Sequence, residues 1–186
     1  APDNIPVSLY DSLIASVHDA LPIFHDYIDL RREVLGLDDL DMHDMYVPIV
    51  PNFEMKVEWA KACEWVRDAC RPLGEEYVKA LERSYSERWI DVYENKGKRS
   101  GAYSGGSYTT APYVLMNYQG TLNWVFTLAH ELGHSLHSWL ANSTQSYSDS
   151  NYTIFVAEIA STTNEMLLHE YLLERADDPR MKAYLL

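Results

Sequence analysis

The stretch Phe126–Leu140, FTLAHELGHSLHSWL, constrains this chain more than any other part of it. Apolar residues recur through it at helical spacing and no proline interrupts it, which predicts an α-helix. On such a helix His130 and His134 lie one turn apart, roughly 6 Å along the axis and about 40° around it. Two imidazoles in that position can share one tetrahedral Zn²⁺ ion. The stretch therefore predicts a helix that offers two metal ligands from one face.

Glu131 follows His130 directly and completes the pattern His-Glu-x-x-His. One residue further along a helix is a rotation of about 100°, so this carboxylate can lie beside a metal without binding it. That is the position of the general base in a zinc hydrolase. A different interpretation stays open at this point, in which the pattern is accidental and the chain is a purely structural helical domain.

A catalytic zinc site needs a third protein ligand and an open fourth position. The candidate is Glu158, in the helical pattern Phe155–Leu168, where Ala157 and Ala160 are small enough to let two helices approach closely. The polar run Asn142–Asn151 is long enough for the chain to reverse between the two helices. We therefore expect His130, His134 and Glu158 to converge.

Two further residues share these helix faces. His137 is about 10 Å from His130 on a straight helix, too far for one ion to bind both, and we expect it to be packed or solvent-exposed. Glu165 is separated from Glu158 by a similar distance. It is either the acceptor for the free ring N–H of a zinc-binding histidine or a plain surface carboxylate.

The rest of the chain predicts a mainly α fold with a small β-sheet next to the His-Glu-x-x-His helix. Gly36 is expected to end the first helix, and Pro22 to kink or divide it. We expect helices over Val7–Leu35 and Glu54–Cys70 and from Pro72, and β-like segments at Met45–Val50 and Tyr113–Tyr118. The chain would then consist of a helical part over 1–100, short strands with a glycine-rich loop over 101–118, and zinc-site helices over 120–175.

Composition excludes several classes of function. The net charge of −13 disfavours nucleic acid and anionic membranes as partners. The acidic connector Leu37–Asp44 lacks the D-x-D-x-D-G pattern of a calcium loop. Cys63 and Cys70 lie about 10 Å apart on a helix, too far for a disulfide. With an opening segment that has no basic n-region, the chain is expected to be cytoplasmic.

Long segments of the sequence resemble a known family. WIDVYENKGKRSGAYSGG, APYVLMNYQGTLNWVFTLAHELGHSLHSW and YTIFVAEIASTTNEMLLHEYLL are similar to the oligoendopeptidase F branch of the thimet-oligopeptidase-like zinc peptidases. The resemblance implies zinc ligands at His130, His134 and Glu158, with Glu131 as general base and proton shuttle. It implies cleavage of short peptides in a deep channel, with a sheet-edge strand that hydrogen-bonds the extended substrate. That strand would be formed by Tyr113, Val114, Leu115, Met116, Asn117 and Tyr118.

Members of this family are several times longer than 186 residues. We therefore expect a part of the catalytic domain, whose partner is the remainder of the same polypeptide. The family's oxyanion-stabilising segment would lie beyond Leu186, which leaves Tyr108, Tyr113 and Tyr118 as candidates here. The expected function is zinc-dependent endopeptidase activity on oligopeptides. The alternative is a zinc- and peptide-binding module without turnover, and the isolated chain is expected to be of low activity or inactive.

Overall fold

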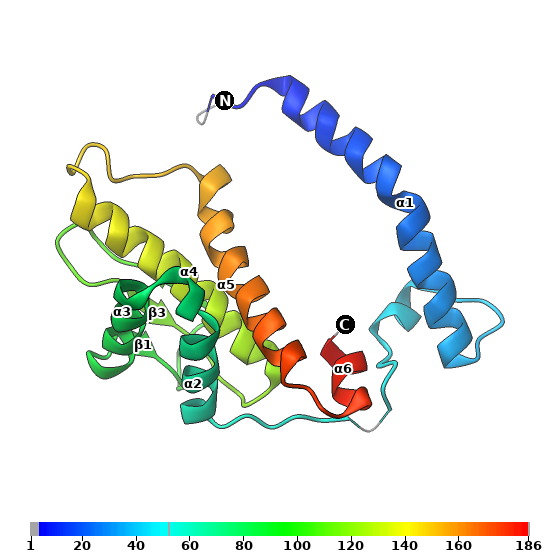
Figure 1. Ribbon diagram of the computed structural model, residues 1–186. Helices are drawn as coiled ribbons and strands as arrows, with labels where there is room; N and C mark the ends of the chain where they lie inside the picture. Colours follow the sequence, from blue (N-terminus) through cyan, green and yellow to red (C-terminus); the bar gives the residue numbers. More distant parts are fainter. Residues whose placement is uncertain (1–3, 52, 186) are drawn as a thin grey trace. The chain divides into compact units, whose positions relative to one another are not determined.

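The computed structural model describes residues 4–51 and 53–185. They divide into two compact units, one formed by the chain up to Phe53 with Asp178–Tyr184, the other by Glu54–Asp177 with Leu185. In the described part of the chain, no helix is both long enough and apolar enough to cross a membrane. The elements are α1 (Val7–Leu35), η1 (Met42–Tyr46), α2 (Trp59–Ala69), η2 (Arg71–Leu73), α3 (Glu75–Ser86), β1 (Ile90–Asp91), β2 (Tyr103–Gly105), β3 (Tyr113–Leu115), α4 (Leu122–Thr144), α5 (Ile154–Glu174) and α6 (Pro179–Leu185). Figure 1 labels the α-helices and the strands β1 and β3.

The first unit contains α1, the short 3₁₀ helix η1 and most of α6. Of the two outcomes expected at Pro22, a kink or a division of the helix, the division does not occur, because α1 continues through Pro22. Gly36 ends the helix in a left-handed conformation as predicted. The β-like segment expected at Met45–Val50 is wrong. The buried guanidinium of Arg31 donates to the carbonyls of Asp44 and Val47, and these contacts hold the segment against α1 rather than in a sheet.

The second unit carries a three-stranded sheet with the order β1-β3-β2 among the described residues. β1 runs parallel to β3, with Ile90 opposite Val114, and β2 runs antiparallel to it, with Ser104 also opposite Val114. The strand Tyr113–Leu115 therefore occupies the centre of the sheet. The prediction that Tyr113–Tyr118 forms a sheet-edge strand is wrong, and only its first half is a strand.

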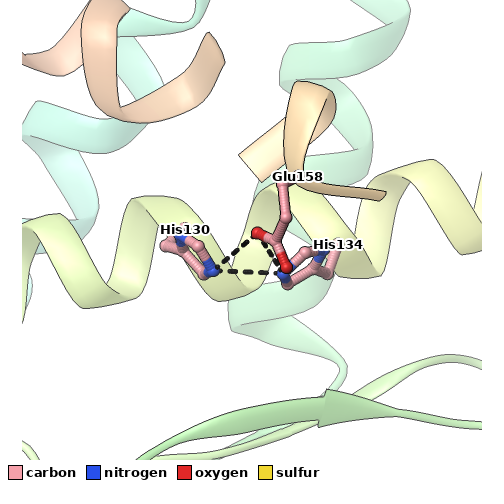
Figure 2. Close-up of side chains that lie close together, drawn as sticks. All are labelled: His130, His134 and Glu158. Carbon is pink, nitrogen blue, oxygen red and sulfur yellow. Dashed lines mark hydrogen bonds and ion pairs between the residues drawn. The ribbon is translucent and has the colours of Figure 1, made fainter. Parts of the chain in front are cut away.

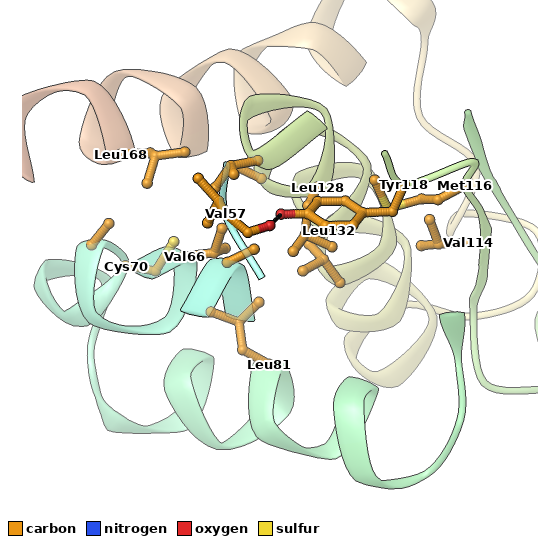
Figure 3. Close-up of a cluster of buried hydrophobic side chains, with 14 of the residues drawn as sticks. Val57, Val66, Cys70, Leu81, Val114, Met116, Tyr118, Leu128, Leu132 and Leu168 are labelled. Atoms are coloured by element: carbon orange, nitrogen blue, oxygen red, sulfur yellow. Dashed lines mark hydrogen bonds between the residues drawn. The ribbon is translucent and has the colours of Figure 1, made fainter. Parts of the chain in front are cut away.

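The core of the second unit lies beneath α4 (Figure 3). Leu128, Leu132 and Leu136 recur every four residues on one face of α4 and are fully buried. Side chains from α2, α3, α5 and the β3 segment complete this core, namely Val66, Cys70, Leu81, Leu168, Val114 and Met116. Burial of this stripe fixes the rotation of α4, so its opposite face, with the two histidines, is turned towards α5.

Both cysteines are free thiols, as the spacing predicted. Burial raises the pKa of Cys63 and that of Cys70 to about 12. A thiol with such a pKa is protonated at neutral pH, which makes it a poor nucleophile and a poor metal ligand.

Candidate metal centre

The close approach of α4 and α5 depends on a glycine. A Cβ atom at Gly133 would lie 2.6 Å from the Cα atom of Ser161 and 2.9 Å from the Ala160 carbonyl oxygen. Both obstacles are backbone atoms, so no rotamer change can relieve them. Glycine inside the His-Glu-x-x-His sequence therefore permits the crossing, and the crossing brings Glu158, one turn from Ser161, against the histidine face of α4.

Figure 2 shows the three side chains that converge there, His130, His134 and Glu158, which we call the α4–α5 cluster. The two Nε2 atoms lie 3.1 Å apart, and Glu158 Oε2 lies 3.4 Å from each of them. With Zn–N bonds of about 2.0–2.1 Å, two ligand atoms of a tetrahedral site are about 3.3–3.4 Å apart. The triangle formed by the three atoms thus has the dimensions of one face of a zinc tetrahedron.

Each member of the α4–α5 cluster is held by a further hydrogen bond. The Nδ1 atom of His130 lies 2.7 Å from Glu165 Oε1. The ring of His134 bonds to the Ala157 backbone, and the Ser161 hydroxyl donates to Glu158 Oε2 at 2.8 Å. An acceptor at Nδ1 keeps the proton of a neutral imidazole on that side and leaves the Nε2 lone pair free for a metal.

Glu131 lies beside this cluster but outside it. It is only 7% exposed, and burial raises the pKa of its carboxyl above the ordinary value. The charge of His130 and a hydrogen bond from the Ser104 backbone oppose that shift in part. The three side chains of the α4–α5 cluster are thus partly exposed to solvent, whereas the neighbouring Glu131 carboxyl is buried and has an increased proton affinity.

His137, on the same face of α4, does not join the cluster. Its ring stacks on Tyr152 with centroids 3.7 Å apart and an interplanar angle of 13°. The Tyr152 hydroxyl is in turn 2.6 Å from the Ser138 hydroxyl. This arrangement agrees with the expectation of a packed histidine and ties the loop before α5 to the C-terminal half of α4.

The residues expected to bind substrate lie mostly in the core. Val114 and Met116 are fully buried, and Asn117 donates to the carbonyls of Arg99 and Gly101. Tyr118, also a candidate for stabilising an oxyanion, is buried and its hydroxyl donates to the Val57 carbonyl. The strand β3 has neighbours on both sides and so offers no free edge to a peptide, whereas the Tyr113 side chain is exposed.

The strand beside the cluster is β2 instead. The hydroxyl groups of Ser104 and Ser135 lie 2.7 Å apart, which joins β2 to α4, and the Ser104 backbone bonds to Glu131. A cavity of about 460 Å³ at the start of β2 includes Ala102, His130 and Glu131 in its walls. A second one of about 430 Å³, at the other end, is bounded by Gly105, Gly106, Tyr108, Ser138 and Tyr152.

A second group of ligand-type side chains lies in the other unit. Asp41, His43 and Asp44, which we call the η1 cluster, also bring ligand atoms within 4.8 Å of one another. They come from the acidic connector that the sequence singled out. The Asp44 side chain already accepts the Asp41 backbone N–H at 2.9 Å, as the capping group of η1.

Sequence reasoning missed three residues that lie around the candidate site: Gly133, Ser104 and Asn164. Gly133 carried a signal, because a glycine in the middle of a helix needs a packing reason. Asn164 carried one too, as a polar residue within the apolar pattern Phe155–Leu168. Ser104 carried none, since its role depends on the sheet order, which is not a local property of the sequence.

A helical unit with a small sheet, a His-Glu-x-x-His helix and a glutamate from the next helix agrees with the class of protein that the family comparison gives, a peptidase. The chain belongs to peptidase family M3, which it matches over residues 1–186. It is 48% identical over 184 residues to oligopeptidase PepF of Bacillus subtilis, covering 99% of this chain and 28% of that protein. It is 46% identical over 182 residues to the chromosomal oligoendopeptidase F of Lactococcus lactis subsp. cremoris, covering 98% and 30%.

Solved structures agree with this assignment. A peptidase from Chlamydophila abortus superposes with a TM-score of 0.87 at 40% identity, over 98% of this chain and 31% of that one. Oligoendopeptidase F from Enterococcus faecium gives a TM-score of 0.61 at 33% identity, over 98% and 24%. The chain thus spans less than a third of the length of each of these relatives.

Proposed function

We propose that this chain carries the zinc centre of a metalloendopeptidase that hydrolyses peptide bonds in short oligopeptides. The observation that carries the proposal is the triangle of His130 Nε2, His134 Nε2 and Glu158 Oε2, with edges of 3.1, 3.4 and 3.4 Å. Three protein ligands leave the fourth position of a tetrahedral ion open, as a catalytic site requires. Membership of a peptidase family supports the same reaction class.

In this proposal the two histidines and Glu158 hold the ion, and Glu165 orients the His130 ring through the 2.7 Å contact at Nδ1. When bound, zinc supplies Lewis-acid chemistry, lowering the pKa of a coordinated water to about 7 and polarising the scissile carbonyl. Thiolate ligands are absent from the site, and the imidazole and carboxylate donors are those that catalytic zinc sites use. The residues described here therefore suit zinc.

Glu131 is the general base. Its carboxylate takes the proton from the attacking water and then delivers it to the amine that leaves. Burial raises the pKa of Glu131, which brings its proton affinity nearer to neutral pH, where one group can both accept and release a proton. The hydrogen bond from the Ser104 backbone holds the carboxylate in place between these two steps.

The free edge of β2 is the proposed binding strand for the substrate backbone. β2 is paired on one side with β3, and among the described residues its other side is the edge of the sheet. Its contact with Glu131 and Ser135 directs that edge along α4, and an extended peptide can add to such an edge as a further strand. The cavities at the two ends of β2 would then receive substrate side chains on either side of the cleaved bond.

The test is Glu131→Gln, made in the complete natural polypeptide that contains residues 1–186. We expect stoichiometric zinc to be retained and kcat on a quenched fluorescent peptide to fall by about 10²–10⁴, the usual worth of a general base. Loss of zinc from the folded variant would make Glu131 a ligand and refute the assigned role. Ser143→Ala, at the exposed end of α4, serves as the control variant.

A second candidate function is binding of zinc and peptide without turnover. It is favoured by one observation: two of the three tyrosines considered for an oxyanion have their hydroxyl groups engaged, Tyr118 by the Val57 carbonyl and Tyr108 by the Gln145 carbonyl. Losing one oxyanion donor costs about 10²–10³ in rate. This alternative would be supported if the zinc-loaded protein binds the peptide without cleaving it, and if removal of the zinc by a chelator does not change the rate of cleavage.

A further inference from the structure

Asn164 is a polar side chain that is 1% exposed, at a point where four helices meet. Its Nδ2 atom donates to the Ala129 carbonyl of α4 at 3.0 Å. Its Oδ1 atom accepts from the Tyr77 hydroxyl of α3 at 2.9 Å and from the thiol of Cys70, the residue that directly follows α2, at 3.6 Å. Asn164 itself belongs to α5, so a single amide connects all four helices.

The orientation of this amide is determined by its partners. The Ala129 carbonyl can only accept, so the Nδ2 side of Asn164 must face it. Burial raises the pKa values of Tyr77 and Cys70, the latter to about 12, so both remain protonated donors at neutral pH. With two donors on one side and one acceptor on the other, the flipped amide would place oxygen against oxygen.

The position of these bonds relates them to the α4–α5 cluster. Ala129 immediately precedes His130, and Asn164 immediately precedes Glu165. Asn164 bonds to Ala129 at 3.0 Å, and the residues that follow them, Glu165 and His130, are in contact at 2.7 Å through Oε1 and Nδ1. Successive residues of a helix are related by a fixed rise of about 1.5 Å and a fixed rotation. Fixing the buried pair therefore fixes the height at which the outer pair meets.

We infer that Asn164 is a positioning residue, which sets the sliding position of α5 along α4 so that Glu165 meets the His130 ring. The inference rests on the proposed function, because it assigns a purpose to the support of a zinc ligand. Apolar contacts between helices tolerate small sliding movements, whereas a buried amide is satisfied at one position only. A leucine at this place would fill the space without specifying that position.

The experiment compares Asn164→Leu with two control variants in the full chain. Tyr77→Phe removes one hydrogen bond to Asn164 but leaves its bond to Ala129 intact. Val66→Ala removes buried volume elsewhere in the core. Three quantities are measured: the zinc dissociation constant by chelator competition, the resistance of the metal-free protein to urea, and the imidazole ¹H–¹⁵N NMR signal of the His130 Nδ1–H group in the metal-free protein.

We expect Asn164→Leu to weaken zinc binding by about 10–100-fold, as loss of a support for a ligand does, and to shift or broaden the His130 signal. The two controls should lower resistance to urea while changing zinc affinity by less than about twofold. If the larger side chain of Asn164→Leu prevents folding, Asn164→Ser replaces it in the test, because the smaller serine side chain cannot overfill the core. The same weakening of zinc binding and the same change of the His130 signal are expected from it.

Two results would overturn the inference. One is unchanged zinc affinity and an unchanged His130 signal in a folded Asn164 variant. The other is an equal loss of affinity in Val66→Ala at matched stability, which would make the effect one of general destabilisation. Failure of the proposed function is distinguishable, since the wild-type protein would then bind no zinc while the His130 signal would still report whether Asn164 positions the ring.

Discussion

The α4–α5 cluster and the η1 cluster each bring three ligand-type side chains within 4.8 Å, yet their supports differ. In the first, the ligands project from two helices that pack closely at Gly133, and Glu165 and Ser161 hold His130 and Glu158. In the second, three neighbouring residues lie on a short 3₁₀ turn, and the His43 side chain is 80% exposed. Both clusters therefore bring ligand-type side chains close together, but only in the α4–α5 cluster do neighbouring side chains fix the orientation of the ligands.

The carboxylates of the η1 cluster also have another use. Asp44 Oδ2 accepts the Asp41 backbone N–H and so stabilises the start of η1, which ties this carboxylate to the turn. In the α4–α5 cluster the bond to Glu165 is made at His130 Nδ1 and leaves the Nε2 atom free, while Glu158 Oε2 accepts from Ser161 and also lies 3.4 Å from both Nε2 atoms. The comparison teaches that a metal site is recognised by what holds its ligands, and it can be tested by substitution.

The largest effect is expected from Glu158→Ala. This change leaves two histidine ligands, and two imidazoles alone do not make a catalytic zinc site. We expect the folded variant to lose stoichiometric zinc on desalting, as measured by atomic emission. Full retention of zinc would show that Glu158 is not a ligand and that another group completes the site.

Gly133→Ala tests the crossing itself. In an open helical position this change stabilises a protein by about 0.5–1 kcal/mol, because alanine has less backbone freedom to lose. Here the added Cβ meets backbone atoms of α5 at 2.6 and 2.9 Å, so we expect destabilisation of about 1–3 kcal/mol and weaker zinc binding. Urea unfolding with zinc titration measures both quantities. An increase in stability would show that α5 does not approach α4 this closely.

A smaller effect is expected from Glu165→Gln, which keeps the shape of the side chain and removes its charge. The His130 ring loses its charged acceptor at Nδ1 but retains its Nε2 lone pair, so zinc affinity should fall by about 10–100-fold. Chelator competition gives the ratio directly. Complete loss of zinc from this variant, with zinc retained in Glu158→Ala, would reverse the roles of the two glutamates.

These local features explain how much of the site the sequence could predict. His130, His134 and Glu131 are related by helix geometry alone, and small residues around Glu158 indicated the partner helix. The order of the strands was harder to predict from the sequence, because it depends on the pairing of β3 with β1, which is a strand of only two residues. The start of α2 was placed too early for a similar reason: Lys56 forms a bridge with Thr121, and Val57 bonds to Gly120, which keeps this segment extended.

A pH dependence should separate the α4–α5 cluster from an exposed group. Burial lowers the pKa of His134 below its ordinary value, and the Glu158 carboxylate opposes this shift only in part. Because the unfolded chain binds a proton here at a higher pH than the folded chain does, this contribution to stability is present above about pH 6.5 and is lost as pH falls through the lower folded pKa. Metal-free wild type should therefore lose more stability below pH 6.5 than His134→Gln does. Parallel urea-unfolding curves against pH would contradict the shift.

The smallest effect is expected from His43→Ala, in the η1 cluster. The ring lies in water and has Asp44 as its neighbour at 3.5 Å, so nothing holds its lone pair towards a shared point. An exposed pair of this kind contributes about 0–1 kcal/mol, and its carboxylate remains occupied by the turn. We expect unchanged zinc stoichiometry and affinity, both in the wild-type background and in Glu158→Ala, where any zinc held by the η1 cluster would be measured alone. A fall from two bound ions to one in His43→Ala would instead establish a second site and would remove the distinction drawn between the two clusters, because supported lone pairs would then not be necessary for binding.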